Sequence, residues 1–170
     1  MDRTPWRADL SGARWTRTGD AEALAAVHAA TWRYAYAGVI PGAGLERMIS
    51  CRGPSWWRRL HGFGGRALVV EFDDRLAGYA LIGRNRGGPG GEIQELYVRP
   101  ECQGVGFGSR LFAAARAALA ARAIAPLTVW CLAANDIGCG FYRAKGGVET
   151  GRMRDRIANV DLEKLRFSWP

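Results

Sequence analysis

Hydrophobic and polar positions change their period along the chain, and each change predicts a different element. Residues 13–19 alternate and predict a strand, whereas residues 20–36 carry apolar side chains at helical spacing and predict a helix with Asp20 as its N-cap. After a break at "GVIPGAG", one or two short helices are expected. The period then becomes two, and the strands predicted by this pattern are 66–73, 76–84 and 92–99.

The C-terminal part of the chain adds a strand between two helices. A strong helix is expected over residues 109–123, an apolar run at 126–133 indicates a buried strand, and a helix from residue 135 is closed by glycine. Two last strands are expected near 148–156 and 161–168. Because a helix joins the third predicted strand to the buried one, these two form a parallel pair in an otherwise antiparallel sheet. The predicted fold class is a mixed α/β sandwich.

The composition fits one folded domain that spans residues 1–170. Hydrophobic residues make up 48% of the chain, and no linker, repeat or low-complexity segment divides it. No apolar run is long enough for a membrane span, and residues 1–15 lack the apolar stretch of a signal peptide, so we expect a cytoplasmic protein. The net charge of +8 favours anionic partners, but the basic residues are scattered and do not indicate a nucleic-acid-binding tail.

The four cysteines are Cys51, Cys102, Cys131 and Cys139, and none belongs to a CxxC pair. This spacing favours separate thiols in a reducing compartment over a disulfide framework, and it predicts no metal site. Cys102 lies beside a glycine-rich stretch, but no base accompanies it in the sequence, so we assign it no role as a nucleophile.

The stretch "PECQGVGFGSRL" sets Gly104, Gly106 and Gly108 at alternate positions between a strand and a helix. The first amides of a helix have no internal partner, so a loop without Cβ atoms there lets a phosphate approach them. The alternative is a tight turn that only needs glycine φ angles. A dinucleotide fold would place this motif on an early strand, and a P-loop would have a lysine where the chain has Ser109-Arg110.

The segment "LYVRPECQGVGFGSRLF" resembles the acetyl-CoA signature Gln/Arg-x-x-Gly-x-Gly/Ala of the GNAT superfamily of N-acetyltransferases. Asn135 and Tyr142 resemble an Asn and a Tyr seven residues apart on the following helix of that family. The segment "TWRYAYAGVIP" resembles the part that shapes the acceptor pocket in many members. The resemblance covers nearly the whole chain and is specific over residues 92–147. It implies a GNAT-like fold, with a mostly antiparallel central sheet, a splayed parallel pair and helices on both faces.

The resemblance also implies how acetyl-CoA binds as the co-substrate. The pyrophosphate would lie on the amides of the glycine loop, which we define as residues 103–109. The pantetheine arm would pair with the backbone of Tyr97 and Val98, where the parallel strands splay, and Asn135 and Tyr142 would complete the site. The arginine that serves the 3′-phosphate is left open. The residues of the glycine loop are Gln103, Gly104, Val105, Gly106, Phe107, Gly108 and Ser109.

Acetyl transfer to an amine needs an oxyanion donor, a base and an acid. In relatives a backbone amide at the position of Val98 serves the oxyanion. Tyr142 suits the acid that protonates the leaving thiolate, because a phenol keeps its proton at neutral pH; the alternative is that it only packs its helix on the sheet. Some relatives carry a glutamate five residues before the Asn, where this chain has Trp130, which cannot accept a proton.

Two glutamates on the splayed strand are the remaining candidates for the base. Strict alternation places Glu92 and Glu95 on opposite faces, so at most one faces the active cleft, and we prefer Glu95 because it lies close to Val98. A solvated or salt-bridged Glu95 is the alternative, with a water chain or a backbone carbonyl as the base instead. For the acceptor pocket the candidates are Trp32 and Tyr36, whose rings either hold a cation or pack in the core.

The sequence therefore predicts an N-acetyltransferase that moves the acetyl group of acetyl-CoA directly to a primary amine of a small molecule or protein. Two alternatives stay open at this point: a non-catalytic acyl-CoA-binding regulatory domain of the same fold, and a basic nucleic-acid-binding module, for which no aromatic-basic face is evident. Relatives often pair through their C-terminal strands, which leaves a homodimer open. No metal is predicted.

Overall fold

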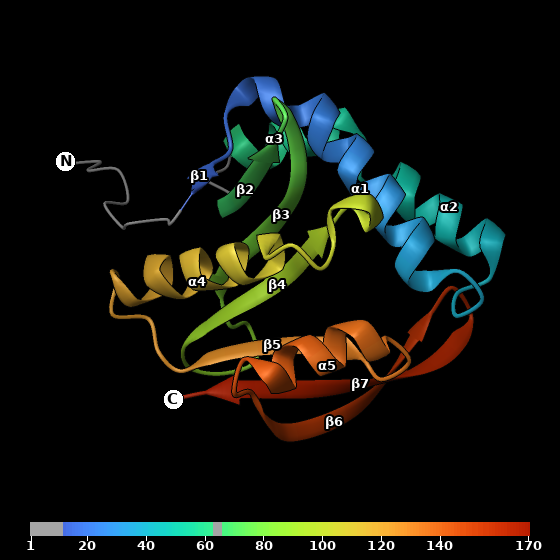
Figure 1. Cartoon of the computed structure of the whole chain (residues 1–170). Coiled ribbons are helices and arrows are strands. Elements are labelled where there is room, and N and C mark those ends of the chain that lie inside the picture. Colours follow the sequence, from blue (N-terminus) through green and yellow to red (C-terminus); the bar gives the residue numbers. More distant parts are fainter. Residues whose placement is uncertain (1–11, 63–65) are drawn as a thin grey trace.

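The computed structural model describes residues 12–62 and 66–170 (Figure 1). The strands are β1 (Ala13–Trp15), β2 (Arg66–Phe72), β3 (Arg75–Arg84), β4 (Gly91–Val98), β5 (Leu127–Leu132), β6 (Val148–Ile157) and β7 (Val160–Trp169). The helices are α1 (Ala21–Tyr36), α2 (Gly42–Ser50), α3 (Pro54–Gly62), α4 (Phe107–Ala120) and α5 (Asp136–Ala144). In the described part of the chain, no helix is long and apolar enough to cross a membrane.

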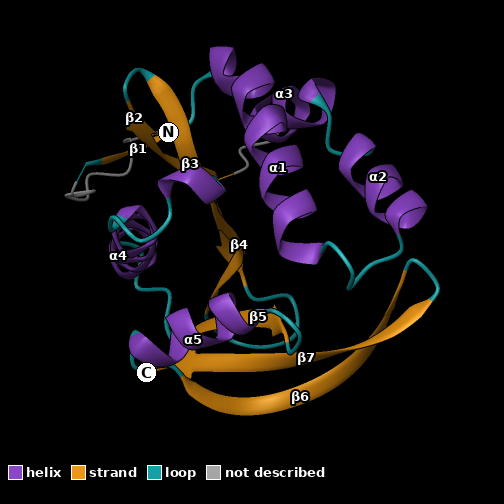
Figure 2. Ribbon diagram, turned by 45° about the vertical axis from the view of Figure 1, so that its right-hand side comes forward, coloured by secondary structure: helices purple, strands orange, loops and turns teal. Residues whose placement is uncertain are grey.

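The strands form one seven-stranded sheet in the order β1-β2-β3-β4-β5-β7-β6. All neighbouring strands pair antiparallel except β4 and β5, which are parallel. Helix α1 and its neighbours α2 and α3 lie on one face of the sheet, and α4 and α5 lie on the other (Figure 2). The predicted mixed fold with helices on both faces is confirmed.

Helix α4 packs on the sheet through an apolar face that its sequence specifies. Leu111, Phe112, Ala115 and Leu119 recur at helical spacing, and all four are buried. They join a core cluster with inward-facing residues of the central strands and with Cys139 and Tyr142 of α5. This shared core fixes the start of α4 and the start of α5 on the same side of the sheet.

The parallel pair separates after only a few residues. Strands β4 and β5 are in register at Gly91 with Leu127, Glu92 with Thr128 and Ile93 with Val129, and no further. Gly90 closes the start of this pair: it has φ +91°, and an added Cβ would lie 2.0 Å from the carbonyl oxygen of Pro126. The second half of β4 therefore runs without a partner strand on that side, which is the predicted splay.

The first predicted strand is shorter than its alternating pattern indicates, and the predicted N-cap of the following helix makes other contacts than expected. Strand β1 ends at Trp15, and a 3-10 turn, Thr18–Asp20, leads into α1. Asp20 does occupy the N-cap position of α1, but its side chain makes no cap hydrogen bond. Instead its carboxylate accepts hydrogen bonds from the Arg14 guanidinium and from the Arg17 amide, both at 2.7 Å. The Asp20 carboxylate thus pairs with the charged guanidinium from β1 rather than with the uncharged amides at the start of α1.

The cysteines are all free thiols, as expected, but two of them are not separate. Cys131 and Cys139 are buried with their sulfur atoms 3.7 Å apart. Burial raises the pKa of the Cys131 thiol, which keeps it protonated.

Candidate active site

A cavity of about 690 Å³ opens where β4 and β5 part. We call it the central cavity. Its walls come from both faces of the sheet: Thr31, Tyr34 and Ala35 of α1 line one side, while the glycine loop and the start of α5 line the other. The end of β4 that has no partner strand on the β5 side contributes Leu96, Tyr97 and Val98. The cavity thus passes through the gap in the sheet, and its volume suits an extended organic ligand.

The glycine loop combines a required backbone conformation with open space. Gly104 and Gly106 have φ of +77° and +96°, which disfavours other residues, and an added Cβ at either would meet no heavy atom within 4 Å. Gly106 is the N-cap of α4 and supplies no side chain to the first amides of that helix. These amides have no intrahelical partner and border the central cavity, so the loop can hold an anion there.

Gly108 differs from the other two glycines of the loop. An added Cβ would lie 3.4 Å from a ring carbon of Phe141, so α5 packs closely against this turn. The side chain of Val105 points outward and is 67% exposed, whereas that of Phe107 is buried in the core. Neither of these two residues lines the central cavity, so neither side chain is placed to contact a ligand there.

The free edge of β4 presents backbone groups to the central cavity. The Arg99 amide donates to the Ala77 carbonyl of β3 at 2.8 Å, and backbone groups alternate in direction along an antiparallel strand. The groups of Val98 and Leu96 therefore face the gap, and those of Tyr97 face β3. Gln103 Nε2 donates to the Val98 carbonyl at 3.1 Å. This geometry favours Val98 and Leu96, rather than Tyr97, as the backbone partners of an extended ligand.

Tyr142 and Asn135 lie together on α5 at the wall of the central cavity. Asn135 is the N-cap of α5, and its Oδ1 accepts from the Gly138 amide at 2.9 Å. The Tyr142 ring packs against Phe112 and Phe167, yet no hydrogen bond of its hydroxyl is found within the described residues. Burial raises the pKa of this hydroxyl, so it keeps its proton at neutral pH. Packing and an available proton are therefore compatible at this position.

A β-bulge changes the faces of the two candidate glutamates. Glu95 pairs with Leu81, but Ile93 pairs with Ile82 and Glu92 with Gly83, so one residue of β4 is extra. Residues opposite each other in a sheet share a face, and Leu81 and Gly83 share theirs. Glu92 and Glu95 therefore lie on the same face, and the expectation of opposite faces is wrong. That face is the one covered by α1.

Glu95 is held by neighbours on that face and does not itself line the central cavity. Its side chain is 8% exposed, Arg52 Nη1 lies 2.5 Å from its Oε1, and the Tyr79 hydroxyl donates to its Oε2 at 2.6 Å. Burial raises the pKa of the Glu95 carboxyl, and Arg52 and Tyr79 counteract that rise.

Trp32 and Tyr36 lie on a different face of α1 from the residues that line the central cavity. The Tyr36 hydroxyl is 2.6 Å from that of Tyr97, and the Trp32 ring packs against Tyr36 with centroids 5.3 Å apart. The cavity face of α1 is formed instead by Thr31, Tyr34 and Ala35, which sequence reasoning missed. Their spacing of three and four residues within "TWRYAY" is the signal that places them on one helical face. Trp32 and Tyr36 were chosen from the sequence for their large aromatic side chains, and they lie on another face of the helix.

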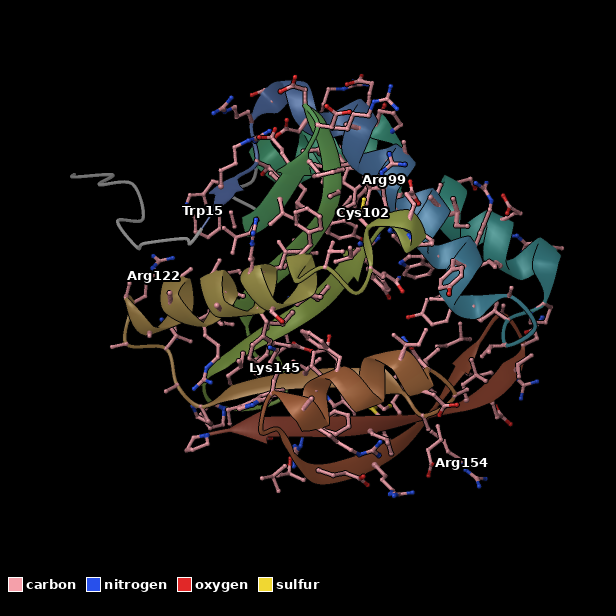
Figure 3. The ribbon with its side chains drawn as sticks, viewed as in Figure 1. Trp15, Arg99, Cys102, Arg122, Lys145 and Arg154 are labelled. Carbon is pink, nitrogen blue, oxygen red and sulfur yellow. The ribbon has the colours of Figure 1, made fainter. Side chains whose placement is uncertain are left out.

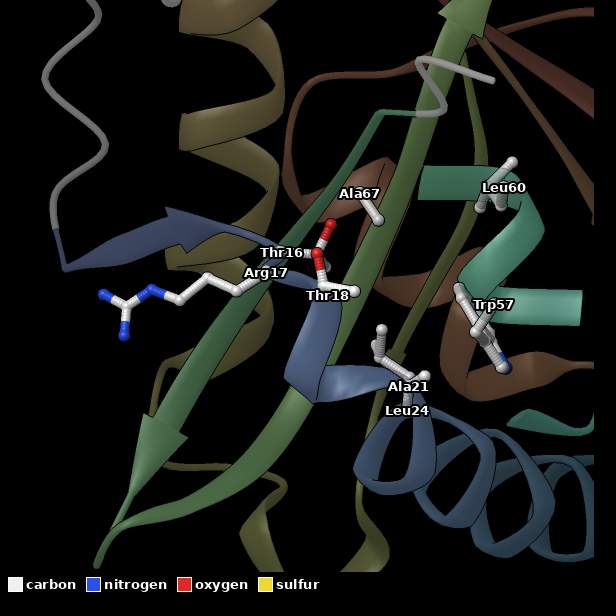
Figure 4. Close-up of a pocket in the computed structure, with 8 residues that line it drawn as sticks. All are labelled: Thr16, Arg17, Thr18, Ala21, Leu24, Trp57, Leu60 and Ala67. Carbon is white, nitrogen blue, oxygen red and sulfur yellow. The ribbon is translucent and has the colours of Figure 1, made fainter. Parts of the chain in front are cut away.

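Basic side chains are spread over the molecule. Figure 3 shows Arg99 at the turn after β4, Arg122 beyond the end of α4, Lys145 at the end of α5 and Arg154 on β6. A second cavity, lined by Thr16, Trp57 and others, holds only about 10 Å³ (Figure 4). That is room for about one water molecule, so it is a packing defect between α1, α3 and β2 rather than a ligand site.

A family model described as the acetyltransferase (GNAT) family matches residues 27–146, a segment that contains the glycine loop, Asn135 and Tyr142. The chain belongs to this family. This GNAT acetyltransferase is 25% identical over 160 residues to the uncharacterised N-acetyltransferase YuaI of Bacillus subtilis, a match that covers 92% of this chain and 91% of that protein. The predicted acetyltransferase activity with acetyl-CoA as co-substrate is confirmed, and no comparison favours the non-catalytic alternative.

Solved structures show that the GNAT acetyltransferase shares its fold with distant proteins. A GCN5-related N-acetyltransferase from Rhodopseudomonas palustris aligns with a TM-score of 0.75 at 23% identity and covers 92% of each chain. PaiA N-acetyltransferase from Thermoplasma acidophilum, solved in complex with coenzyme A, aligns with a TM-score of 0.73 at 18% identity over 92% of this chain and 98% of that chain. At this identity the agreement concerns the fold.

Proposed function

We propose that the central cavity binds acetyl-CoA from the side of α4 and α5, and that a primary amine enters from the side of α1. The observation that carries this proposal is that one cavity passes through the gap in the sheet and has walls on both faces. The glycine loop supplies free amides for the diphosphate, and the unpaired edge of β4 supplies hydrogen bonds for the pantetheine arm. The acceptor then meets the thioester from the opposite face, and transfer is direct.

The residues can carry each part of the transfer. As the amine nitrogen bonds to the thioester carbon, the carbonyl oxygen gains negative charge, which the Val98 amide stabilises. The carbon–sulfur bond then breaks, and the departing thiolate takes a proton from the Tyr142 hydroxyl. The amine loses its proton to Glu95, which lies on the acceptor face but outside the lining of the central cavity, so water would carry the proton between them. Tyr142 and Glu95 therefore act on opposite sides of the gap.

Thr31, Tyr34 and Ala35 form the acceptor wall in this proposal, with Trp32 and Tyr36 behind them. Tyr34 is 54% exposed and offers a ring at the cavity mouth to an organic cation. The acceptor is a primary amine of a small molecule or a protein. Pairing of two chains through β6 and β7 stays a prediction.

A panel of primary amines tests the proposed function by release of free thiol from acetyl-CoA. We expect calorimetric binding of acetyl-CoA without any acceptor, and thiol release that rises with the concentration of at least one amine. Binding without acceptor-dependent release from any amine would support the regulatory-domain alternative. Absence of binding would contradict the assignment of the central cavity.

A further inference from the structure

Behind the acceptor wall, four polar side chains from different elements meet in the core. We call them the carboxylate cluster: Glu95 of β4, Tyr79 of β3, His28 of α1 and Arg52 from the turn between α2 and α3. His28 and Tyr79 are fully buried, and Glu95 nearly so. A charged group at such depth needs a partner, and Arg52 is the cation that reaches it.

Arg52 is held in place by an aromatic ring as well as by the carboxylate. Its guanidinium carbon lies 4.1 Å from the centroid of the Trp56 ring, which is on α3 four residues later. The side chain of Arg52 is 28% exposed, so its stem reaches inward from the surface to Glu95. A stacked, planar guanidinium fixes both the position and the direction of the carboxylate that it pairs with.

The hydrogen bonds of the cluster have one direction. The Tyr79 hydroxyl donates to Glu95 Oε2, so its oxygen accepts from His28 Nδ1, which lies 2.8 Å away. His28 is then the neutral tautomer with its proton on Nδ1, and burial together with Arg52 lowers its pKa to about 3. Among the described groups that face Glu95, Arg52 is therefore the one that carries a positive charge at neutral pH.

Two further hydroxyls complete the surroundings of Glu95. Tyr97 of β4 and Tyr36 of α1 are hydrogen-bonded to each other, and both are electrostatically coupled to the Glu95 carboxylate. Burial raises the pKa of both hydroxyls, so both stay neutral. They supply no charge that could replace that of Arg52.

We propose that Arg52 is a positioning residue for acetyl transfer, which holds the buried Glu95 carboxylate ionised and oriented as the base. This inference rests on the proposed function, because it takes Glu95 as the base. It assigns a role to the turn between α2 and α3, a segment outside the glycine loop and outside the central cavity. Without Arg52, the buried carboxylate binds a proton at a higher pH and cannot accept one from the amine.

The test compares the pH dependence of kcat/KM in Arg52→Met, Arg52→Lys and the wild type, with the best amine of the panel. We expect the acidic limb of the profile to move up by about one pH unit or more in Arg52→Met, since an opposite charge at this distance lowers a carboxyl pKa by about 1–3 units. Arg52→Lys keeps the charge, so the acidic limb of its profile is expected to lie close to that of the wild type. The matched control is Arg58→Met, which removes an exposed arginine of α3 that pairs with Glu22 of α1.

A second measurement does not depend on turnover. The carboxyl resonance of Glu95, assigned by its loss in Glu95→Gln, is titrated by ¹³C NMR in the wild type and in the Arg52 variants. A purely structural role for Arg52 would lower kcat/KM equally at every pH and leave the Glu95 titration in place, and that result would overturn the inference. If Arg52→Met fails to fold, Arg52→Lys and Tyr79→Phe carry the test, because Tyr79→Phe removes the other donor and shifts the limb in the same direction.

Glu95→Gln separates failure of the inference from failure of the proposed base. Wild-type turnover in Glu95→Gln would refute Glu95 as the base, and with it the proposed proton route. Loss of turnover in Glu95→Gln, together with an unshifted profile in Arg52→Met, would refute only the role of Arg52.

Discussion

Substitution of Gly106 by alanine tests the glycine loop most directly, because its cost for folding and its cost for binding have separate origins. Gly106 has φ +96°, and a non-glycine residue in this region costs about 1–2 kcal/mol. The added Cβ meets no heavy atom within 4 Å, so no steric cost is added in the free protein. For a domain of 170 residues, we expect Tm to fall by about 2–4 °C for each kcal/mol.

The same methyl group enters the space in which the proposed diphosphate meets the first amides of α4. Loss of one hydrogen bond to a charged group costs about 1.5–3 kcal/mol, which corresponds to a rise in the Kd for acetyl-CoA of about ten- to a hundredfold. Gly146→Ala is the matched control, since Gly146 has φ +77°, equally open surroundings and no place in the wall of the central cavity. It should lose similar stability and keep its affinity.

Thermal unfolding measures the first cost, and isothermal titration calorimetry with acetyl-CoA measures the second. A Kd for Gly106→Ala within twofold of the wild-type value would refute the amide cradle. Equal weakening in Gly106→Ala and Gly146→Ala would show that the effect on binding comes from general strain.

The remaining predictions concern three side chains. Tyr142→Phe should lower kcat by about a hundredfold or more while Tm changes little, because the hydroxyl makes no hydrogen bond within the described residues; unchanged turnover with a good acceptor would remove Tyr142 from the mechanism. Asn135→Ala should lower the free energy of unfolding by about 1 kcal/mol through loss of the cap to Gly138, as urea titration would measure, and an unchanged midpoint would argue against the cap. His28 has a folded-state pKa of about 3 against an ordinary 6.5, so the unfolded chain binds the extra proton between these values and stability falls by about 1.4 kcal/mol per pH unit on acidification from pH 6.5. Urea titrations across this range should show a shallower pH dependence in His28→Gln, and identical slopes would contradict a buried neutral imidazole.

The periods along the sequence predicted the elements well, because an element that is buried on one face carries apolar residues at the period of its own geometry. The apolar face of α4 and the change to a period of two at residue 66 both correspond to buried positions in the structure. The glycine loop was found for the same reason, since Gly104 and Gly106 are needed locally for their φ angles. Features that depend on neighbouring residues were therefore accessible.

Features that depend on residues far apart in the sequence could not be predicted from it. The extra residue in β4 follows from the pairing with β3, and nothing in "EIQELYV" marks it, so strict alternation misplaced Glu92 relative to Glu95. The pairing of Arg52 with Glu95 joins two residues that lie far apart in the sequence. Such a contact is set by how α3 docks on the sheet, which no local pattern records.

The short register between β4 and β5 has a consequence for how the enzyme behaves when its donor is scarce. Three residue pairs join the two parts of the sheet, and the rest of that seam lacks the hydrogen bonds that a strand would normally supply. A bound pantetheine arm would supply hydrogen bonds to this part of β4, so binding of the donor would also stabilise the sheet. We therefore expect resistance to heat and to proteolysis to rise with acetyl-CoA concentration, which would couple the lifetime of the enzyme to the supply of its donor.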